Sequence, residues 1–418
     1  MFILIKLMRT SYQVKPLTLV SALLYICYLS PFEPDSIMKL PAIFKSKSIS
    51  GVILIACVVL SLIIANSPLG ERFESFLAFN LGAGFLRLSI LNWINDGLMA
   101  VFFFFIGLEI KQEMLEGHLS SFKQASVPVL AAVGGAVIPA AIYLFFNSDT
   151  ATVNGWGIPM ATDIAFALSV LSLLGKIVPP ALKAFLSTLA VVDDLLAILV
   201  IAIFYAAELH WVYLLAGLAI FLMLMLFDKV GVKHKAFYII PGLVMWYFIH
   251  HSGVHATIAG VLTAITIPNQ SKNGSPLKQL AHRLEAPVNF IILPLFAIAN
   301  TNIRFTSDMV GGLGSSLGLG IIIGLIIGKP IGVMLISWLS VKCKIGSLSK
   351  LISWKMIAGV GLLAGIGFTM SIFMSFLSLS NSQQNSNAKF SILIASISAG
   401  VIGYFFLRHA LKGQRALS

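Results

Sequence analysis

Long apolar runs separated by short polar stretches dominate the chain from Gly51 onward. The runs are continuous and do not alternate every second residue, which favours membrane-spanning helices over the strands of a transmembrane barrel. Several runs fall short of the roughly 20 residues of a straight span, so their polar flanks must add turns. The pattern predicts an all-α polytopic membrane protein with twelve spans, whose apolar cores lie near residues 51–66, 91–108, 127–146, 156–174, 181–207, 211–227, 236–249, 253–268, 286–300, 313–338, 356–380 and 390–407.

Composition supports lipid as the surrounding solvent. Of the 418 residues, 58% are apolar and 11% are charged, whereas soluble domains carry about 25% charged residues. A cytosolic enzyme, a secreted disulfide scaffold, a disordered chain and a free nucleic-acid binder are thereby excluded. The three cysteines, Cys27, Cys57 and Cys343, are scattered singly and indicate neither a disulfide framework nor a zinc site.

Lysine and arginine are distributed unevenly over the predicted connections. One set of alternate connections holds only Arg72, Arg87, Arg304 and Lys389, and every other basic residue from Lys39 onward, except one inside a span, belongs to the opposite set. Cytoplasmic loops carry such an excess of basic residues. We therefore expect both termini in the cytoplasm, and the formal net charge of +12 needs no nucleic-acid partner.

The N-terminal residues fit this topology poorly. Three basic residues precede an apolar run, Leu17–Leu29, that is too short to span and has the charge pattern of a signal peptide. Met38 is a better start for the predicted topology. We expect residues 1–44 to be an N-terminal extension, residues 45–410 to be the twelve-helix domain and residues 411–418 to be a cytoplasmic tail. The intact mass of the native protein tests whether residues 1–37 are present.

Ionisable side chains interrupt the predicted spans at six positions, which are Asp96, Glu109, Asp163, Asp193, Asp194 and Lys329. A charge at mid-membrane costs about 2.5–3.5 kcal/mol on insertion scales, so such residues normally face a wet cavity or a partner. A buried ion pair that fixes helix packing is a credible alternative for Asp96 and Glu109, which lie near span ends. It is a weak explanation for Asp193 and Asp194, because adjacent like charges make a poor structural device.

The adjacent aspartates point about 100° apart on a helix. One should therefore face an aqueous cavity and the other a protein partner, for which Lys329 is the obvious cation. Burial and like-charge repulsion favour the neutral form of a carboxyl group, which lets it exchange protons in the physiological range. Ionised carboxylates also supply the hard oxygen ligands of a small cation. The same atoms would hold protons or a metal ion, which is the coupling that an exchanger requires.

Helix breakers occur at comparable places in two spans. Gly155–Pro159 precedes Thr162–Asp163 in one span, and Gly365–Gly367 precedes Phe368–Thr369 in the other. Paired broken helices are typical of inverted repeats around a midplane site, although two ordinary kinks are an alternative because Gly and Pro are common in membrane helices. We expect the carboxylate at the first break to compensate helix N-termini and Lys329 to compensate helix C-termini.

Seven sequence strings resemble the bacterial NhaA sodium/proton antiporters: WINDGLMAVFFFFIGLEIKQE, MATDIAFALSVLSLLG, LAVVDDLLAI, SGVHATIAGV, NFIILPLFAIAN, GKPIGV and LLAGIGFTMSIF. They occur in the family's order. NhaA itself exemplifies the rule on paired broken helices, so that rule adds no independent support. The resemblance implies inverted repeats of helices 3–5 and 10–12, with broken helices 4 and 11 that cross. It also implies a non-enzymatic, cofactor-free exchange of two protons for one Na⁺ or Li⁺ across the bacterial inner membrane, for pH and sodium homeostasis.

The resemblance further implies roles for individual residues. Asp194 is similar to the principal cation-binding and proton-carrying carboxylate, and Asp193 to its neighbour, which is paired with Lys329. Asp163 and Thr162 resemble the assembly at the helix crossing. Na⁺ would take ligands from Asp194, Asp193 and Thr162.

Further positions match accessory residues of the family. Asp96 matches a carboxylate that is important for transport, and the positions linked to pH response are Glu109, Glu113, His255 and His282. The chain departs from the family pattern at Gln112, Ala281 and Glu285. These departures lie outside the ion-binding residues and fall among the positions linked to pH response. The sequence therefore does not predict a strong dependence of activity on pH.

Residues 79–91 contain glycines followed by alternating apolar and polar positions, which is typical of a small hairpin, although an ordinary loop fits almost as well. In the family, an outer hairpin between helices 1 and 2 mediates dimers. The resemblance therefore implies a homodimer through this segment, which is shortened here. Lipid is the other expected partner.

Two other functions use similar residues. An intramembrane hydrolase would need a serine or metal centre, and Ser252 near His255 is the one tempting pair, but it lacks a nucleophile-elbow motif. A cation channel also uses carboxylates, but it needs neither a midplane lysine nor proton competition. The chain contains no GxxxxGK[ST] string, so an ion gradient is the expected energy source.

Overall fold

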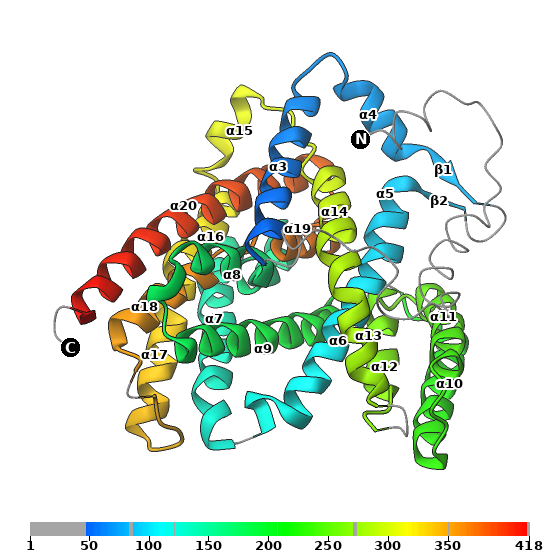
Figure 1. The fold of residues 1–418 in the computed structure, drawn as a ribbon. Helices are drawn as coiled ribbons and strands as arrows, with labels where there is room; N and C mark the ends of the chain where they lie inside the picture. Colours follow the sequence, from blue (N-terminus) through cyan, green and yellow to red (C-terminus); the bar gives the residue numbers. More distant parts are fainter. Residues whose placement is uncertain are drawn as a thin grey trace.

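The computed structural model describes residues 47–82, 87–120, 122–206, 208–270, 274–349 and 351–415, and most of them are helical (Figure 1). The predicted extension at residues 1–44 and the end of the predicted tail lie outside these ranges. In the first half of the chain the helices are α3 (Lys47–Ala65), α4 (Gly70–Ala78), α5 (Ile90–Asn92), η3 (Trp93–Leu98), α6 (Met99–Glu116), η4 (His118–Ser120), α7 (Phe122–Asn147), η5 (Val153–Met160), α8 (Ile164–Leu173), η6 (Gly175–Ile177) and α9 (Pro180–Phe204).

The second half continues in the same way. Its helices are α10 (Trp211–Val230), α11 (Ala236–His251), α12 (Thr257–Thr266), α13 (Pro276–Pro287), η7 (Val288–Ile292), α14 (Leu293–Asn300), α15 (Ser307–Gly312), α16 (Ser316–Ile323), η8 (Gly324–Gly328), α17 (Lys329–Lys342), α18 (Trp354–Ala364), α19 (Phe368–Ser378) and α20 (Ser382–Arg415). Three of the short elements, η3, η7 and η8, are π-helical turns inside longer helices.

The positions of these helices along the chain match the predicted spans. In the described part of the chain, eight helical stretches are long and apolar enough to cross a membrane, and two more candidates are pairs bent at a break, α3 with α4 and α18 with α19. The shorter helices α11 and α12 have 16 and 10 residues. Each of the twelve predicted spans overlaps a helix. The all-α membrane fold is therefore confirmed.

Two groups of three spans repeat one order of elements. The first group is α7, then η5 with α8, then α9; the second is α16 through α17, then α18 with α19, then α20. In each group a broken span stands between two continuous ones, and we refer to η5 with α8 as helix 4, to α16–η8–α17 as helix 10 and to α18 with α19 as helix 11. Helix α7 packs along α17 and α19 packs against η5, so the two groups interlock at their breaks.

Close packing of α7 against α17 depends on facing glycines. A side chain at Gly134 would collide with the carbonyl oxygen of Gly332, and a side chain at Gly332 would collide with the backbone of Gly134. Small residues let membrane helices approach this closely. An added Cβ at the neighbouring Gly135 would lie 3.5 Å from Cε of Lys329, so this contact brings α7 beside the lysine stem.

A short antiparallel hairpin joins the first two spans. Strand β1 (Asn80–Leu81) pairs with β2 (Leu88–Ser89), with Asn80 opposite Ser89 and Leu81 opposite Leu88. Both strands lie beside α4, at the same end of the molecule as α15 (Figure 1). Of the two predicted alternatives for residues 79–91, the hairpin is therefore the one that forms.

Many large apolar side chains are exposed on the outer surface. Helix α10 lies at one edge of the molecule, opposite α20 (Figure 1), and its buried residues are Gly217 and Leu224. Its large side chains Trp211, Leu215 and Leu222 are at least 60% exposed. Such a surface requires an apolar solvent. A bilayer meets that requirement without further protein.

Candidate ion-binding site

The two broken helices contact each other at their breaks. In helix 4 the chain is non-helical between Met160 and Ile164, and in helix 11 α18 and α19 are bent by 47° across the three residues that separate them. The N–H of Asp163 donates to the carbonyl of Ile366 at 2.7 Å, and the hydroxyl of Thr162 donates to the carbonyl of Ala364 at 2.8 Å. The predicted crossing of helices 4 and 11 is present.

The side chain of Asp163 accepts hydrogen bonds from backbone N–H groups at the N-terminal ends of α8 and α19, which are the second halves of the two broken helices. Its Oδ1 accepts from the N–H of Phe166 in α8 at 3.0 Å, and its Oδ2 accepts from the N–H of Thr369 in α19 at 3.1 Å and from the Thr369 hydroxyl. A buried N–H without a partner in lipid costs several kcal/mol, and a carboxylate at a helix N-terminus also offsets the helix dipole. Asp163 thus lies where the sequence led us to expect a compensating charge.

Serine hydroxyls satisfy further backbone groups at the crossing. Ser371 of α19 donates to the carbonyl of Ile158 at 2.7 Å, and Ser396 of α20 accepts from the N–H of Phe368 at 3.2 Å. All of these groups are buried. Sequence reasoning did not single out either serine, because a serine in an apolar helix carries no mark of its partner.

Lys329 joins the crossing to α9. Its ammonium nitrogen donates to Oδ2 of Asp193 at 2.7 Å and to the carbonyl of Met160, where η5 ends. The lysine side chain is 0% exposed and that of Asp193 is 1% exposed. The structure therefore brings together the two residues that were expected to pair, and it places the cation at the C-terminal end of η5.

Two buried carboxylate oxygens beside this pair have no hydrogen-bond partner among the described residues. They are Oδ1 of Asp193 and Oδ1 of Asp194, and both side chains are about 1% exposed. Asp194 lies within electrostatic range of Asp193, Asp163 and Glu109. Buried oxygens of this kind normally have a partner. A proton or a small cation would supply one, and the donor set of carboxylate and hydroxyl oxygens fits a hard cation such as Na⁺.

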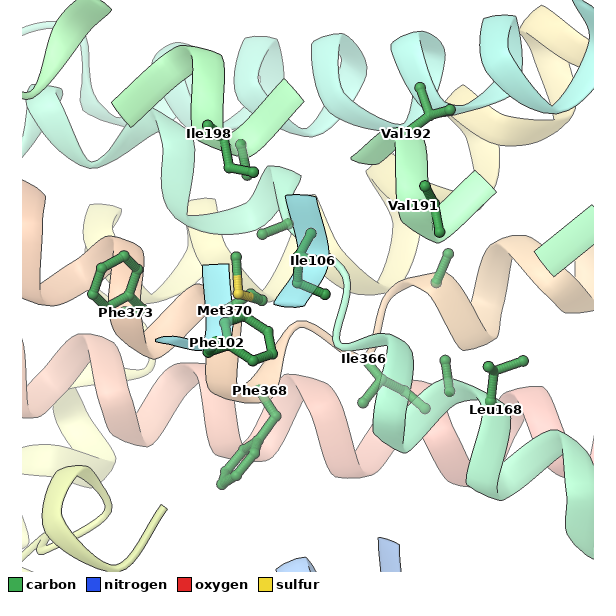
Figure 2. Close-up of a cluster of buried hydrophobic side chains, with 14 of the residues drawn as sticks. Phe102, Ile106, Leu168, Val191, Val192, Ile198, Ile366, Phe368, Met370 and Phe373 are labelled. Carbon is green, nitrogen blue, oxygen red and sulfur yellow. The ribbon is translucent and has the colours of Figure 1, made fainter. Parts of the chain in front are cut away.

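Apolar side chains surround the crossing and keep it in a low dielectric. Figure 2 shows them converging from α6, α8, α9 and helix 11; the labelled ones are Phe102, Ile106, Leu168, Val191, Val192, Ile198, Ile366, Phe368, Met370 and Phe373. In such surroundings a charge interacts strongly with its neighbours. Binding or release of one cation at this place therefore changes the energy of every other charge nearby.

A cavity of about 130 Å³ reaches this region from one side. Its polar lining includes Glu109, Gln112 and Glu113 of α6 together with Glu285 and Asn289, and its apolar lining includes Val191, two residues before Asp193. This volume holds a few water molecules, whose share of liquid volume is about 30 Å³ each. The cavity lies at the end of α6 that the basic-residue distribution assigns to the cytoplasm.

The residues expected to respond to pH are only partly gathered at this cavity. Glu109 and Glu113 line it, and so does Glu285, one of the departures from the family pattern. His282 does not line it; its side chain is 89% exposed, and its Nδ1 lies 4.0 Å from Glu285. The helical register of α13 thus turns Glu285 toward the cavity and leaves His282 on the surface.

Asp96 and His255 lie together. The Oδ1 atom of Asp96, within the π-helical turn η3, lies 3.7 Å from Nε2 of His255, and both side chains are about 15% exposed. The backbone carbonyl of Asp96 accepts from the indole N–H of Trp246 at 3.3 Å. The ring of His255 meets Phe373 of α19 edge-on at 5.5 Å, which links the pair to helix 11.

The structure does not form the serine–histidine pair of a hydrolase. The hydroxyl of Ser252 donates to the carbonyl of Ile249 at 2.7 Å and accepts from the N–H of Val254. Nδ1 of His255 instead lies 3.1 Å from the Thr257 hydroxyl. The Ser252 hydroxyl thus makes its hydrogen bonds to the backbone at the C-terminal end of α11. It does not bond to a histidine that could act as a general base.

Crossing broken helices with a buried aspartate–lysine pair define a polytopic ion-transport protein of the inverted-repeat class. Comparison with known proteins narrows the class: the Na+/H+ antiporter 1 family model matches residues 41–407, and the chain belongs to that family. It is 58% identical over 378 residues to the Na(+)/H(+) antiporter NhaA 2 of Flavobacterium johnsoniae, covering 89% of this chain and 93% of that protein. It is 48% identical to the NhaA antiporters of Flavobacterium psychrophilum, over 380 residues (90% and 98%), and Tolumonas auensis, over 370 residues (87% and 93%).

Proposed function

We propose that this protein is an electrogenic antiporter that exchanges one Na⁺ or Li⁺ for two H⁺, with protons and the cation competing for Asp194 and Asp193. Membership of the Na+/H+ antiporter 1 family supports the exchange of Na⁺ for H⁺. The observation that carries the mechanism is the buried Lys329–Asp193 pair, next to which Oδ1 of Asp194 has no hydrogen-bond partner among the residues that the structure describes.

The charges of this cluster account for two protons. In the proton-loaded state Asp194 is neutral and Lys329 is an ammonium paired with Asp193. Release of one proton from Asp194 and one from Lys329 frees both carboxylates, so Asp193 and Asp194 can bind Na⁺ through their oxygens, with the Thr162 hydroxyl as a third ligand. Two positive charges leave and one enters. Each cycle therefore moves one net charge across the membrane.

The helix crossing makes alternating access possible. Non-helical backbone in a membrane is tolerated where it is enclosed by protein, and in transporters built from inverted repeats access alternates as one repeat moves against the other around a fixed site. The breaks of helices 4 and 11 are joined by side-chain hydrogen bonds, so a shift in one break moves the other. In the state described here, the cavity beside Glu109 and Glu113 is the access route on one side.

The same proposal includes the placement and assembly of the protein. A chain with this excess of basic residues on one side would lie in the bacterial inner membrane with both termini in the cytoplasm. There it would serve pH and sodium homeostasis. The β1–β2 hairpin would pair with that of a second copy to form a homodimer.

Reconstituted protein tests the exchange. Proteoliposomes with an imposed proton gradient and an entrapped pH-sensitive dye should show proton movement when Na⁺ or Li⁺ is added, and none with K⁺. The rate should rise when valinomycin and K⁺ remove the membrane potential that electrogenic exchange builds up. An unchanged rate would contradict a stoichiometry of two protons per cation, and Na⁺ flux that moves no protons would identify a channel.

A further inference from the structure

The turn that precedes Lys329 in helix 10 is wider than an α-helical turn. The N–H of Lys329 bonds to the carbonyl of Gly324, five residues back, which closes the π-helical turn η8. An α-helix would bond this N–H to Leu325, four residues back. A π-helical turn inserts one extra residue and is frequent at functional sites. The lysine is therefore the residue at which the helix returns to its normal pitch.

A proline follows Lys329, the first residue after this wide turn. Pro330 is the second residue of α17 and has no N–H, so it cannot bond to the carbonyl of Ile326 and draw the turn back to α-helical register. The stretch formed by α13, η7 and α14 shows the same arrangement. The N–H of Leu293 bonds to the carbonyl of Val288, five residues back, and Pro294 follows. In two of the three π-helical turns of the described ranges, the residue after the turn is thus followed by a proline.

Neighbouring helices pack closely against the wide turn. An added Cβ at Gly324 would lie 2.8 Å from Pro159 of η5, and one at Gly328 would lie 3.1 Å from Cα of Pro139 in α7. Helix α18 also comes close, since an added Cβ at Gly361 would lie 2.8 Å from Cα of Pro330. The turn is therefore enclosed between helix 4 and helix 11, whose breaks form the ion site.

We propose that Pro330 is a positioning residue for ion exchange, because it keeps η8 wide and thereby directs Lys329 at Asp193 and the carbonyl of Met160. Loss of one residue from a helical turn rotates the following side chain by about 100°. Such a rotation would turn the ammonium group away from both of its partners. The inference rests on the proposed role of Lys329 in exchange.

The test compares four proteins in proteoliposomes: wild type, Pro330→Ala, Lys329→Ala and the double variant P330A/K329A. The measured quantities are the apparent KM for Na⁺ and the pH profile of exchange. Pro330→Ala restores the backbone N–H, so we expect it to raise KM or displace the pH profile in the same direction as Lys329→Ala, by on the order of tenfold in KM. In the Lys329→Ala background it should have no further effect, because its action passes through the lysine.

The control is Pro241→Ala. Pro241 lies inside α11, and no π-helical turn precedes it. This variant should leave both the KM and the pH profile unchanged. If Pro330→Ala is not recovered as folded protein, Pro330→Gly restores the same N–H and adds no atoms against Gly361.

The outcomes separate this inference from the function on which it rests. Wild-type exchange in Pro330→Ala, together with altered exchange in Lys329→Ala, would overturn the positioning role and leave the proposed function intact. An additive loss in the double variant would show that Pro330 acts through general packing, which also overturns the inference. Wild-type exchange in Lys329→Ala would refute the role of the lysine itself.

Discussion

The ammonium nitrogen of Lys329 lies 2.7 Å from Oδ2 of Asp193, and neither side chain reaches solvent. Removing one partner of a buried pair leaves an uncompensated charge and typically costs about 3–5 kcal/mol. Asp194, one residue further along α9, has no such cation within hydrogen-bond distance in the described ranges. Removal of the Asp193 carboxylate should therefore destabilise the fold more than removal of the Asp194 carboxylate.

We expect Asp194→Asn to abolish exchange and to leave folding intact, because an amide neither binds a proton in this range nor supplies an anionic oxygen to Na⁺. Na⁺-driven proton movement in proteoliposomes measures exchange, and the thermal transition of the purified protein measures folding. Asp149→Asn is the matched control, since Asp149 is exposed and its side chain accepts a hydrogen bond from the neighbouring Ser148. Wild-type exchange rates in Asp194→Asn would refute the assignment.

Asp193→Asn should impair exchange less completely, because Lys329 can still exchange a proton. It should also lower the thermal transition temperature more than Asp194→Asn does, since it leaves the ammonium group without its counter-charge. This loss of stability should shrink as the pH rises, because a deprotonated lysine needs no counter-charge. Thermal unfolding of both variants over a pH series checks the order and the trend, and equal losses at every pH would contradict it.

Thr162→Ala should weaken the affinity for Na⁺ while changing the maximal rate little. The hydroxyl of Thr162 bonds to the carbonyl of Ala364 and is available as a neutral cation ligand, so its removal costs a neutral interaction of about 1 kcal/mol, or roughly fivefold in KM. Thr162→Ser keeps the hydroxyl and serves as the control. A fall in maximal rate with an unchanged KM would assign the hydroxyl to helix packing instead.

The histidine of α13 should matter less for pH response than the glutamate three residues further on. His282 is exposed and Glu285 lines the cavity, so His282→Ala should leave the pH profile of exchange unchanged while Glu285→Gln alters it. Exchange rates of the two variants over one pH series make the comparison. If the pH profile of exchange shifts in His282→Ala and not in Glu285→Gln, the histidine takes part in the pH response, as the family resemblance implies.

The hairpin should be required for dimers and not for folding. Leu88 pairs with Leu81, and proline at position 88 would remove a backbone donor from the two-residue strand. If the protein forms the proposed dimer, we expect Leu88→Pro to give a monomer without a large change in thermal stability. Native mass spectrometry in detergent measures the oligomer, and a dimer that persists in this variant would place the interface elsewhere.

The sequence predicted the spans and the charged centre because both depend on residue type alone. A continuous apolar run implies a membrane helix, and a charge inside it implies a partner, which is how Lys329 could be paired with one of the two adjacent aspartates; the resemblance to the NhaA antiporters is what pointed to Asp193. The glycine and proline residues near Thr162 and near Gly367 likewise predicted where helices 4 and 11 break.

Other features of the site depend on helix register, which residue type does not reveal. Ser371 and Ser396 became recognisable only when the crossing placed a carbonyl and an N–H beside them. Residues three apart on a helix differ by about 60° in direction, so the sequence could not tell whether His282 or Glu285 faces inward. The wide turn before Lys329 also leaves no periodic signature.

The mutual satisfaction of backbone groups at the crossing has a consequence for biosynthesis. Thr162 and Asp163 find their partners at Ala364, Ile366 and Thr369, some two hundred residues later in the chain. In a nascent chain that stops before helix 11, the hydroxyl of Thr162 and the N–H of Asp163 therefore lack the partners that they have in the complete protein. Almost the whole polypeptide must be synthesised before the first half of the chain can reach its final packing. Truncated products should therefore be degraded by membrane proteases.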